Sequence, residues 1–129
     1  MKTNVLVVSA EGDEAAGISE MLKPGGYTAD IIESLDLLEE VISTNGCMAV
    51  LIDLDTIAVS NRAVRQLTLQ FPQVCFFCAS WKPFHPELKD AICYHIYACI
   101  QKPIDPEELL YWMKSIAAQI DDNPSMHPP

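Results

Sequence analysis

The sequence predicts an α/β domain in which a parallel β-sheet is covered by helices on both faces. Five short apolar runs alternate along the chain with five longer segments whose apolar residues recur at helical spacing. The first run, NVLVVS at residues 4–9, is rich in β-branched side chains, as expected of a strand buried on both faces. Hydrophobic residues make up 50 % of the 129 residues, which is enough for the core of one domain.

Glycine, proline and small polar residues set the limits of these elements. Pro24-Gly25-Gly26 ends the first helical segment, and Asn45-Gly46 ends the second. Ser34 and Asp105 are suited to cap helices, and Pro106 follows Asp105 at a first helical position. We expect strands at 4–9, 27–32, 47–52, 73–79 and 97–100, and helices at 11–23, 34–44, 60–71, 86–94 and 106 to about 120.

The domain is expected to span residues 1–120. Residues 121–129, DDNPSMHPP, are polar and proline-rich, so they are expected to form a tail or a truncated linker. No run approaches the ~20 apolar residues of a membrane-spanning helix, and no signal peptide is recognisable. These features predict a soluble, cytoplasmic protein.

The net charge limits the choice of partner. Eight Lys and Arg residues against 18 Asp and Glu residues give a net charge of −10 at pH 7. Such a surface repels phosphate backbones and anionic lipid, so we expect no direct nucleic-acid or membrane binding. Basic protein surfaces and cations are the favoured partners.

Polar side chains follow the later strands, where parallel sheets place their ligand chemistry. Asp53 closes the third strand, Ser80 follows the fourth, and Lys102-Pro103 follows the fifth. In these residues the chain resembles the receiver domain of two-component response regulators (CheY-like) over about residues 4–119. The segment at 100–109, IQKPIDPEEL, is similar to the strand–Lys-Pro–helix segment of that family. A second alignment, with Cys78 in the hydroxyl position, fits the spacing to Lys102 less well.

The resemblance implies a fold and a set of roles. The sheet order would be 2-1-3-4-5, and the Lys102–Pro103 peptide would be cis. Asp53 would accept a phosphoryl group, Lys102 would contact it as a point charge, and the Ser80 hydroxyl would act as the switch. The simpler alternatives are that Asp53 is a strand-end cap paired permanently with Lys102, and that Ser80 caps the next turn.

The chain departs from the family where the family holds its metal. Two adjacent acidic residues are expected after the first strand, and this sequence has Ser9 and Ala10. Glu11 and Asp55 are the remaining acidic groups that could join Asp53, so we expect Mg²⁺ binding to be weak or absent. Glu11 also suits a helix start, which is its simpler reading.

A second departure lies in the fifth strand. Cys99 stands where the family usually carries an aromatic switch residue, three positions before Lys102. Tyr97, two positions earlier, is expected on the same strand face and would be the substitute.

The cysteines are expected to be reduced and buried in an apolar core. Cys75 and Cys78 form a C-x-x-C sequence, but it lies inside a strand rather than at a helix start, which argues against redox chemistry. The cysteines lack the paired spacing of zinc ligands, with or without His85 or His95. No hydrolase, Walker or dinucleotide motif is present, so an enzyme is not expected.

Three functional hypotheses follow. The first is a receiver that accepts a phosphoryl group on Asp53 from a histidine kinase or phosphotransfer protein and relays it by protein contact. The alternative is a phosphorylation-independent pseudo-receiver that acts as a docking or dimerisation module. A flavodoxin-like flavin protein is the third, and the acidic loop at 9–13 argues against it.

A docking face is expected on the fourth helix, fifth strand and fifth helix. Tyr94, Tyr97, Tyr111 and Trp112 fall within this part of the chain. Tyr and Trp are favoured anchors at interfaces, and receivers commonly dimerise through this face, so we expect a homodimer or a docked partner there.

Overall fold

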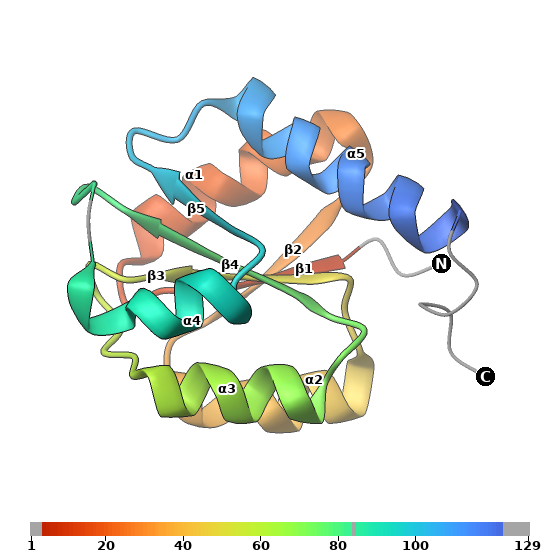
Figure 1. Ribbon diagram of the computed structural model, residues 1–129. Helices are drawn as coiled ribbons and strands as arrows, with labels where there is room; N and C mark the ends of the chain where they lie inside the picture. Colours follow the sequence, from red (N-terminus) through yellow and green to blue (C-terminus); the bar gives the residue numbers. More distant parts are fainter. Residues whose placement is uncertain (1–3, 84, 123–129) are drawn as a thin grey trace.

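Five parallel strands form one sheet in the order β2-β1-β3-β4-β5, which confirms the predicted topology (Figure 1). The computed structural model describes residues 4–83 and 85–122. The strands are β1 (Asn4–Val8), β2 (Thr28–Ile32), β3 (Ala49–Asp53), β4 (Cys75–Ser80) and β5 (Ala98–Gln101).

Helices cover both faces of the sheet (Figure 1). Helices α1 and α5 lie on one face, and α2, α3 and α4 lie on the other. Their bounds are α1 (Gly12–Leu22), α2 (Leu38–Asn45), α3 (Asn61–Gln70), α4 (Lys89–Tyr94) and α5 (Pro106–Asp122), with 3₁₀ turns at Lys23–Gly25, Leu35–Leu37 and Pro86–Leu88.

Two apolar clusters, one on each face of the sheet, form the core. On the first face Val7 and Leu51 of the central strands pack with Ile18 of α1 and Met113 of α5. On the second face the strands pack with α2, α3 and α4; the main residues are Leu6, Val50, Phe76, Cys78, Leu38, Val64 and Ala91. The alternation of the strands therefore sends successive side chains into opposite clusters.

The central strands β1, β3 and β4 are buried almost throughout, whereas β2 and β5 are partly exposed. Strands β1, β3 and β4 therefore contribute most of the buried side chains of the sheet. Strand β5 is an edge strand because it comes last in the sheet order, and α4 and α5 lie on either side of it.

Side-chain caps mark the start of α3 and α5. The Ser60 hydroxyl accepts a hydrogen bond from the Ala63 amide at 3.1 Å, and the Asp105 carboxylate accepts one from the Glu107 amide at 2.9 Å. Ser34 makes no capping bond through its side chain, and the predicted helix from Ser34 begins with a 3₁₀ turn before α2. Gly26 ends the first helical segment with φ +84°, a backbone conformation that favours glycine.

The predicted tail begins within the last turn of α5, since that helix ends at Asp122. The rest of it, residues 123–129, lies outside the described residues. The Lys102–Pro103 peptide is cis, as the family resemblance implied.

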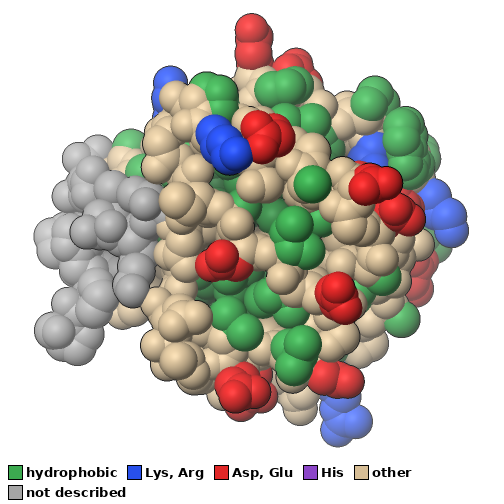
Figure 2. Space-filling view, turned by 180° about the vertical axis from the view of Figure 1, so that it is seen from behind, with side chains coloured by type: hydrophobic (Ala, Val, Ile, Leu, Met, Phe, Trp, Pro, Cys, Tyr) green, Lys and Arg blue, Asp and Glu red, His purple; other side chains and the backbone are tan. Residues whose placement is uncertain are grey.

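Acidic side chains are distributed over the face of the molecule opposite to the view of Figure 1, among apolar and uncharged polar ones (Figure 2). Among the described residues, no helix has the length and apolar character needed to cross a membrane.

Candidate functional site

Four buried polar side chains meet at the carboxyl ends of the strands. Ser9 follows β1, Asp53 ends β3, Ser80 ends β4 and Lys102 follows β5. Each is at most 4 % exposed. The parallel register brings them to one edge of the sheet, and the Lys102 amide donates to the Ser80 carbonyl at 2.8 Å. The structure therefore places the predicted Asp53, Ser80 and Lys102 in one site.

Both carboxylate oxygens of Asp53 accept two hydrogen bonds each. Oδ1 accepts from Lys102 Nζ at 2.7 Å and from the Asp55 amide at 3.1 Å. Oδ2 accepts from the Ser9 hydroxyl at 2.9 Å and from the Thr56 hydroxyl at 3.0 Å. A carboxylate offers about four lone-pair positions, so this set of donors uses all of them.

One ammonium is shared by three carboxylates. Lys102 Nζ lies 2.7 Å from Asp53 Oδ1 and 3.0 Å from Asp55 Oδ2, and it also forms an ion pair with Glu14 of α1. The Lys102 and Asp53 side chains are 2 % exposed, whereas Asp55 and Glu14 are partly exposed. Three negative charges around one positive charge leave this cluster with a net charge of −2.

The Ser80 hydroxyl is hydrogen-bonded to Asp55. Ser80 Oγ donates to Asp55 Oδ1 at 2.9 Å, and the Trp81 amide donates to Asp55 Oδ2 at 3.1 Å. The Ser80 hydroxyl also accepts from the Lys82 amide at 3.1 Å, which is a local cap of the kind considered as the simpler alternative. Asp55 therefore links Ser80 to Lys102.

The ionised forms of these groups are favoured. Burial acts to raise the pKa of Asp53, but hydrogen bonds from Lys102, Ser9 and Thr56 outweigh it and hold the pKa below its ordinary value. For Asp55, burial is likewise outweighed by hydrogen bonds from Lys102 and Ser80, so its pKa is also lowered. Burial opposes the charge of Lys102, but its three carboxylate partners raise its pKa.

Two members of the cluster were absent from the sequence prediction. Glu14 reaches Lys102 from the first turn of α1, and Thr56 reaches Asp53 from the turn after β3. Glu11 was predicted instead, but it is exposed, and among the described residues no hydrogen bond or ion pair joins its carboxylate to Asp53, Asp55 or Lys102. Glu14 lies in the first turn of the helix that follows β1, which is the one sequence signal that points to it.

The carboxylate oxygens of Asp53 and Asp55 contact Lys102 and hydrogen-bond donors of the protein. Ala10 has no ligand atom, and its amide donates to Thr56 Oγ1 at 3.0 Å. The acceptor positions of Asp53 are used, and the Lys102 ammonium stands among the three carboxylates. Across residues 4–83 and 85–122, no group of three or more His, Cys, Asp and Glu side chains is arranged to hold a metal ion.

The two residues predicted to share a face of the fifth strand lie on different faces. Tyr97 precedes β5, and its ring packs on Phe77 and, edge-on at 5.8 Å between centroids, on Trp112. Cys99 pairs in register with Cys78, whose side chain belongs to the α2–α3–α4 cluster. The prediction was wrong because β5 begins only at Ala98, so the strand alternation does not extend to Tyr97.

Most of the predicted docking residues are exposed. Tyr94 of α4 is 79 % exposed and Tyr111 of α5 is 63 % exposed, whereas Tyr97 is at 36 %. Trp112 is half-buried and packs against the core. The face therefore presents two strongly exposed tyrosines beside a stacked aromatic group.

Comparison with solved structures identifies the fold as that of CheY-like receiver domains. A response-regulator receiver domain from Methanospirillum hungatei JF-1 superposes with a TM-score of 0.81 at 15 % identity, covering 95 % of this chain and 100 % of that one. The receiver domain of an HD domain-containing protein from Pseudomonas fluorescens Pf-5 gives 0.82 at 16 % identity, with coverage of 95 % and 100 %.

A third similar structure is an atypical orphan response regulator described as having a phosphorylation-independent regulatory mechanism. It gives a TM-score of 0.76 at 18 % identity, covering 89 % of this chain and 95 % of that one. No protein-family model and no curated protein matches the sequence.

Proposed function

We propose that this chain is a receiver-type signalling module that acts by protein–protein contact and depends little on phosphorylation of Asp53. The observation that carries the proposal is the full set of hydrogen bonds to the Asp53 carboxylate. A nucleophilic oxygen must release at least one of these donors before it attacks a phosphoryl group. Ser9 and Thr56 hold the oxygen that Lys102 does not contact, so they would be displaced first.

The side chains around Asp53 support the same proposal. Phosphoryl transfer relies on positioning and on cations that offset the charge of the transferring group. Here Ala10 contributes no ligand, and a Mg²⁺ ion would compete with the Lys102 ammonium for the oxygens of Asp53 and Asp55. We therefore expect Mg²⁺ to be held weakly or not at all, and the transfer to Asp53 to be slow.

The second candidate function is phosphoryl acceptance on Asp53 from a histidine kinase or phosphotransfer protein. It is favoured by the meeting of Asp53, Ser80 and Lys102 at one edge of the sheet. In that case Asp55 would have to release Ser80, whose hydroxyl now donates to it at 2.9 Å.

Restoring the missing acids separates the two candidates. The double variant Ser9→Asp with Ala10→Asp is compared with the wild type for Mg²⁺ affinity by calorimetry. It is also compared for phosphorylated fraction by intact mass after acetyl phosphate treatment. We expect the double variant to bind Mg²⁺ at least about tenfold more tightly, since tenfold requires only about 1.4 kcal/mol from the new ligands. Its phosphorylated fraction should rise as well.

Two controls complete this experiment. Ala16→Asp adds a negative charge at an exposed position of α1 and should behave as the wild type. Asp53→Ala in the double variant should abolish phosphorylation. Wild-type protein that is phosphorylated as completely and as fast as the double variant would favour the second candidate and refute the first.

The docking face of the proposed module is the surface of α4, β5 and α5, and we propose a second copy of this chain as its occupant. Tyr94 and Tyr111 are exposed there, and tyrosine gives large contact area at low entropic cost.

Sedimentation velocity should show a dimer that Tyr111→Glu disrupts and that Asp53→Asn leaves intact. Leu37→Glu, at an exposed apolar residue away from this face, is the matched control. A monomer at high concentration would contradict this assignment.

A further inference from the structure

Two cysteines stand side by side at the edge of the sheet, one buried and one open to solvent. Cys78 of β4 and Cys99 of β5 are register partners on neighbouring parallel strands. Cys78 is fully buried, whereas Cys99 is exposed. This corrects the expectation that all five cysteines lie in the core, since Cys99 lies on the partly exposed edge strand β5.

The spacing of the two strands suits a bond between these residues. Neighbouring strands lie about 4.8 Å apart, which falls within the ~4.4–6.8 Å between α-carbons that disulfides tolerate. Register partners on parallel strands also send their side chains to the same face.

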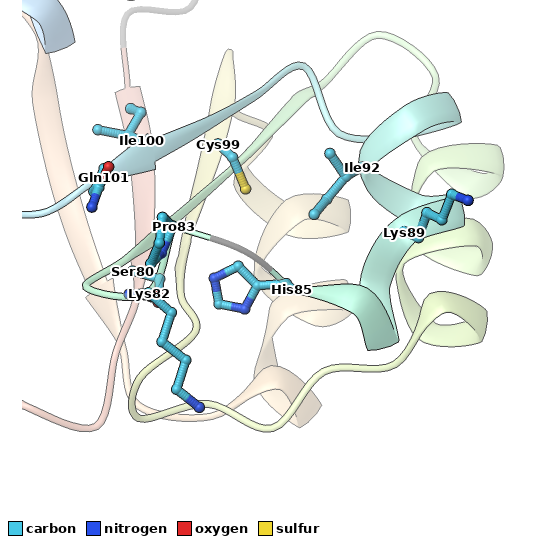
Figure 3. Close-up of a pocket in the computed structure, with 9 residues that line it drawn as sticks. All are labelled: Ser80, Lys82, Pro83, His85, Lys89, Ile92, Cys99, Ile100 and Gln101. Atoms are coloured by element: carbon cyan, nitrogen blue, oxygen red, sulfur yellow. Dashed lines mark hydrogen bonds between the residues drawn. The ribbon is translucent and has the colours of Figure 1, made fainter.

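Cys99 opens into a pocket that carries polar groups. The pocket has a volume of about 280 Å³ and is lined by Cys99, Ile92, His85, Lys82 and Lys89, among others (Figure 3). His85 is only 8 % exposed, and its Nε2 is buried with no hydrogen-bond partner among the described residues. A buried unpartnered nitrogen beside a thiol is a place where a small polar molecule gains a hydrogen bond.

The electrostatics of the pair favour the thiolate of Cys99. The hydrogen bond from Cys78 lowers the pKa of Cys99, and it outweighs the opposing effect of burial. The same hydrogen bond, followed by burial, raises the pKa of Cys78. Lys82 and Lys89 add positive charge to the pocket wall. Cys99 is the exposed thiol of the pair and Cys78 is fully buried, so Cys99 is the more accessible and the more reactive of the two.

We propose that Cys99 is an oxidation site for small hydroperoxides and that Cys78 resolves it into a disulfide between β4 and β5. This inference does not rest on the proposed function, because it involves neither Asp53 nor Lys102. It gives the chain a covalent input that needs no phosphoryl donor.

The chemistry balances in two steps. The Cys99 thiolate attacks one oxygen of hydrogen peroxide; an S–O bond forms, the O–O bond breaks, and hydroxide leaves and takes up a proton as water. The sulfur of Cys78 then attacks the Cys99 sulfur; an S–S bond forms, the S–O bond breaks, and the second water carries away the oxygen and the Cys78 proton. Two thiols are oxidised to one disulfide while one peroxide is reduced to two waters.

The test uses the full chain, reduced and then freed of reductant, treated with hydrogen peroxide and measured by intact mass. The wild type should become lighter by two hydrogens. Chymotrypsin, which cleaves after aromatic residues, separates Cys78 (in 78–81) from Cys75 and Cys99 (in 98–111) from Cys93. The linked pair should be recovered as one peptide that reductant divides. A wild type that keeps its mass, only gains oxygen or links other cysteines would overturn the proposal.

Variants and labelling sharpen the result. Cys78→Ala should stop at the sulfenic acid, trapped at Cys99 by dimedone, and Cys99→Ala should not react. Cys75→Ala removes a buried thiol of β4 on the other face and should still form the disulfide.

In the wild type, iodoacetamide should modify Cys99 at least about tenfold faster than Cys75 or Cys78, because reactivity follows exposure and thiolate fraction. Equal rates at the three cysteines would refute the assignment, and this measurement needs no variant.

Discussion

The Asp53 site and the Cys99 pocket both include Ser80, at the end of β4. They differ in how completely their polar groups are hydrogen-bonded. At the first, every acceptor position of the Asp53 carboxylate is used. At the second, His85 Nε2 is buried without a described partner, and the Cys99 thiol is open to solvent. A saturated network resists new ligands, whereas an incomplete one can gain from them. We therefore expect the Cys99 thiol of β5, rather than the Asp53 carboxylate, to be the group that reacts with small molecules.

The largest effect on the free energy of unfolding should come from removing the Lys102 ammonium, which pairs with Asp53, Asp55 and Glu14. Lys102→Met leaves Asp53 as a buried charge without its ion-pair partner, which costs about 3–5 kcal/mol of unfolding free energy. Lys23→Met removes the exposed pair with Glu20 and should cost at most about 1 kcal/mol. Urea unfolding of both variants measures the difference. Equal losses would mean that the buried network adds nothing to stability.

Removing one hydroxyl should have a smaller but clear effect. Ser9→Ala takes away a buried hydrogen bond to the Asp53 carboxylate, and such bonds to charged groups contribute about 1.5–3 kcal/mol. Ser43→Ala, at an exposed position of α2, serves as the control and should stay within about 0.5 kcal/mol of the wild type. If Ser9→Ala behaves like this control, Thr56 and Lys102 suffice to hold Asp53.

The network should also make stability depend on pH on the acid side. The pKa values of Asp53 and Asp55 are lowered in the folded protein, so their contribution is fully present above the ordinary value of 3.8. It is lost as the pH falls through their lower folded-state pKa values. Unfolding free energies measured from neutral pH to below 3.8 should fall less steeply for Asp53→Asn than for the wild type. The exposed Asp36→Asn should follow the wild type, and parallel curves for all three proteins would contradict the account.

The smallest effect on stability is expected at the reactive site. Cys99→Ser changes an exposed side chain and should alter the unfolding free energy by no more than about 0.5 kcal/mol. Cys78→Ser places a hydroxyl among apolar neighbours and should cost about 1–3 kcal/mol. Thermal or urea unfolding of the reduced proteins measures both. A large loss at Cys99 would mean that it is a structural residue and not an open one.

The sequence predicted the fold better than it predicted the site. Alternating apolar runs predicted five strands and five helices, and Asp105 caps the last helix as predicted, whereas the predicted cap Ser34 makes no side-chain capping bond. The placement of Asp53, Ser80 and Lys102 at one edge follows from parallel strands ending together. These features depend on local pattern and topology, which a single sequence carries.

The contacts within the site could not be predicted in the same way. Glu14 and Thr56 enter the cluster through the phase of α1 and the turn after β3, and neither is adjacent in sequence to a strand end. Glu11 was chosen for its position in the chain, but it precedes the helix and is exposed to solvent. The exposure of Cys99 depends on the packing around the edge strand β5. These outcomes rest on tertiary packing, which residue spacing alone does not specify.

The central claim is that the Asp53 carboxylate is closed to cations and phosphoryl donors by its own hydrogen bonds. Carbon-13 NMR of that carboxyl carbon, followed against pH and then against added Mg²⁺, measures this at the atom concerned. The account predicts that Asp53 titrates below its ordinary value of 3.8 and that its signal at neutral pH does not move as Mg²⁺ is added. A titration at or above 3.8, or a saturable Mg²⁺-dependent shift of the Asp53 signal, would contradict it.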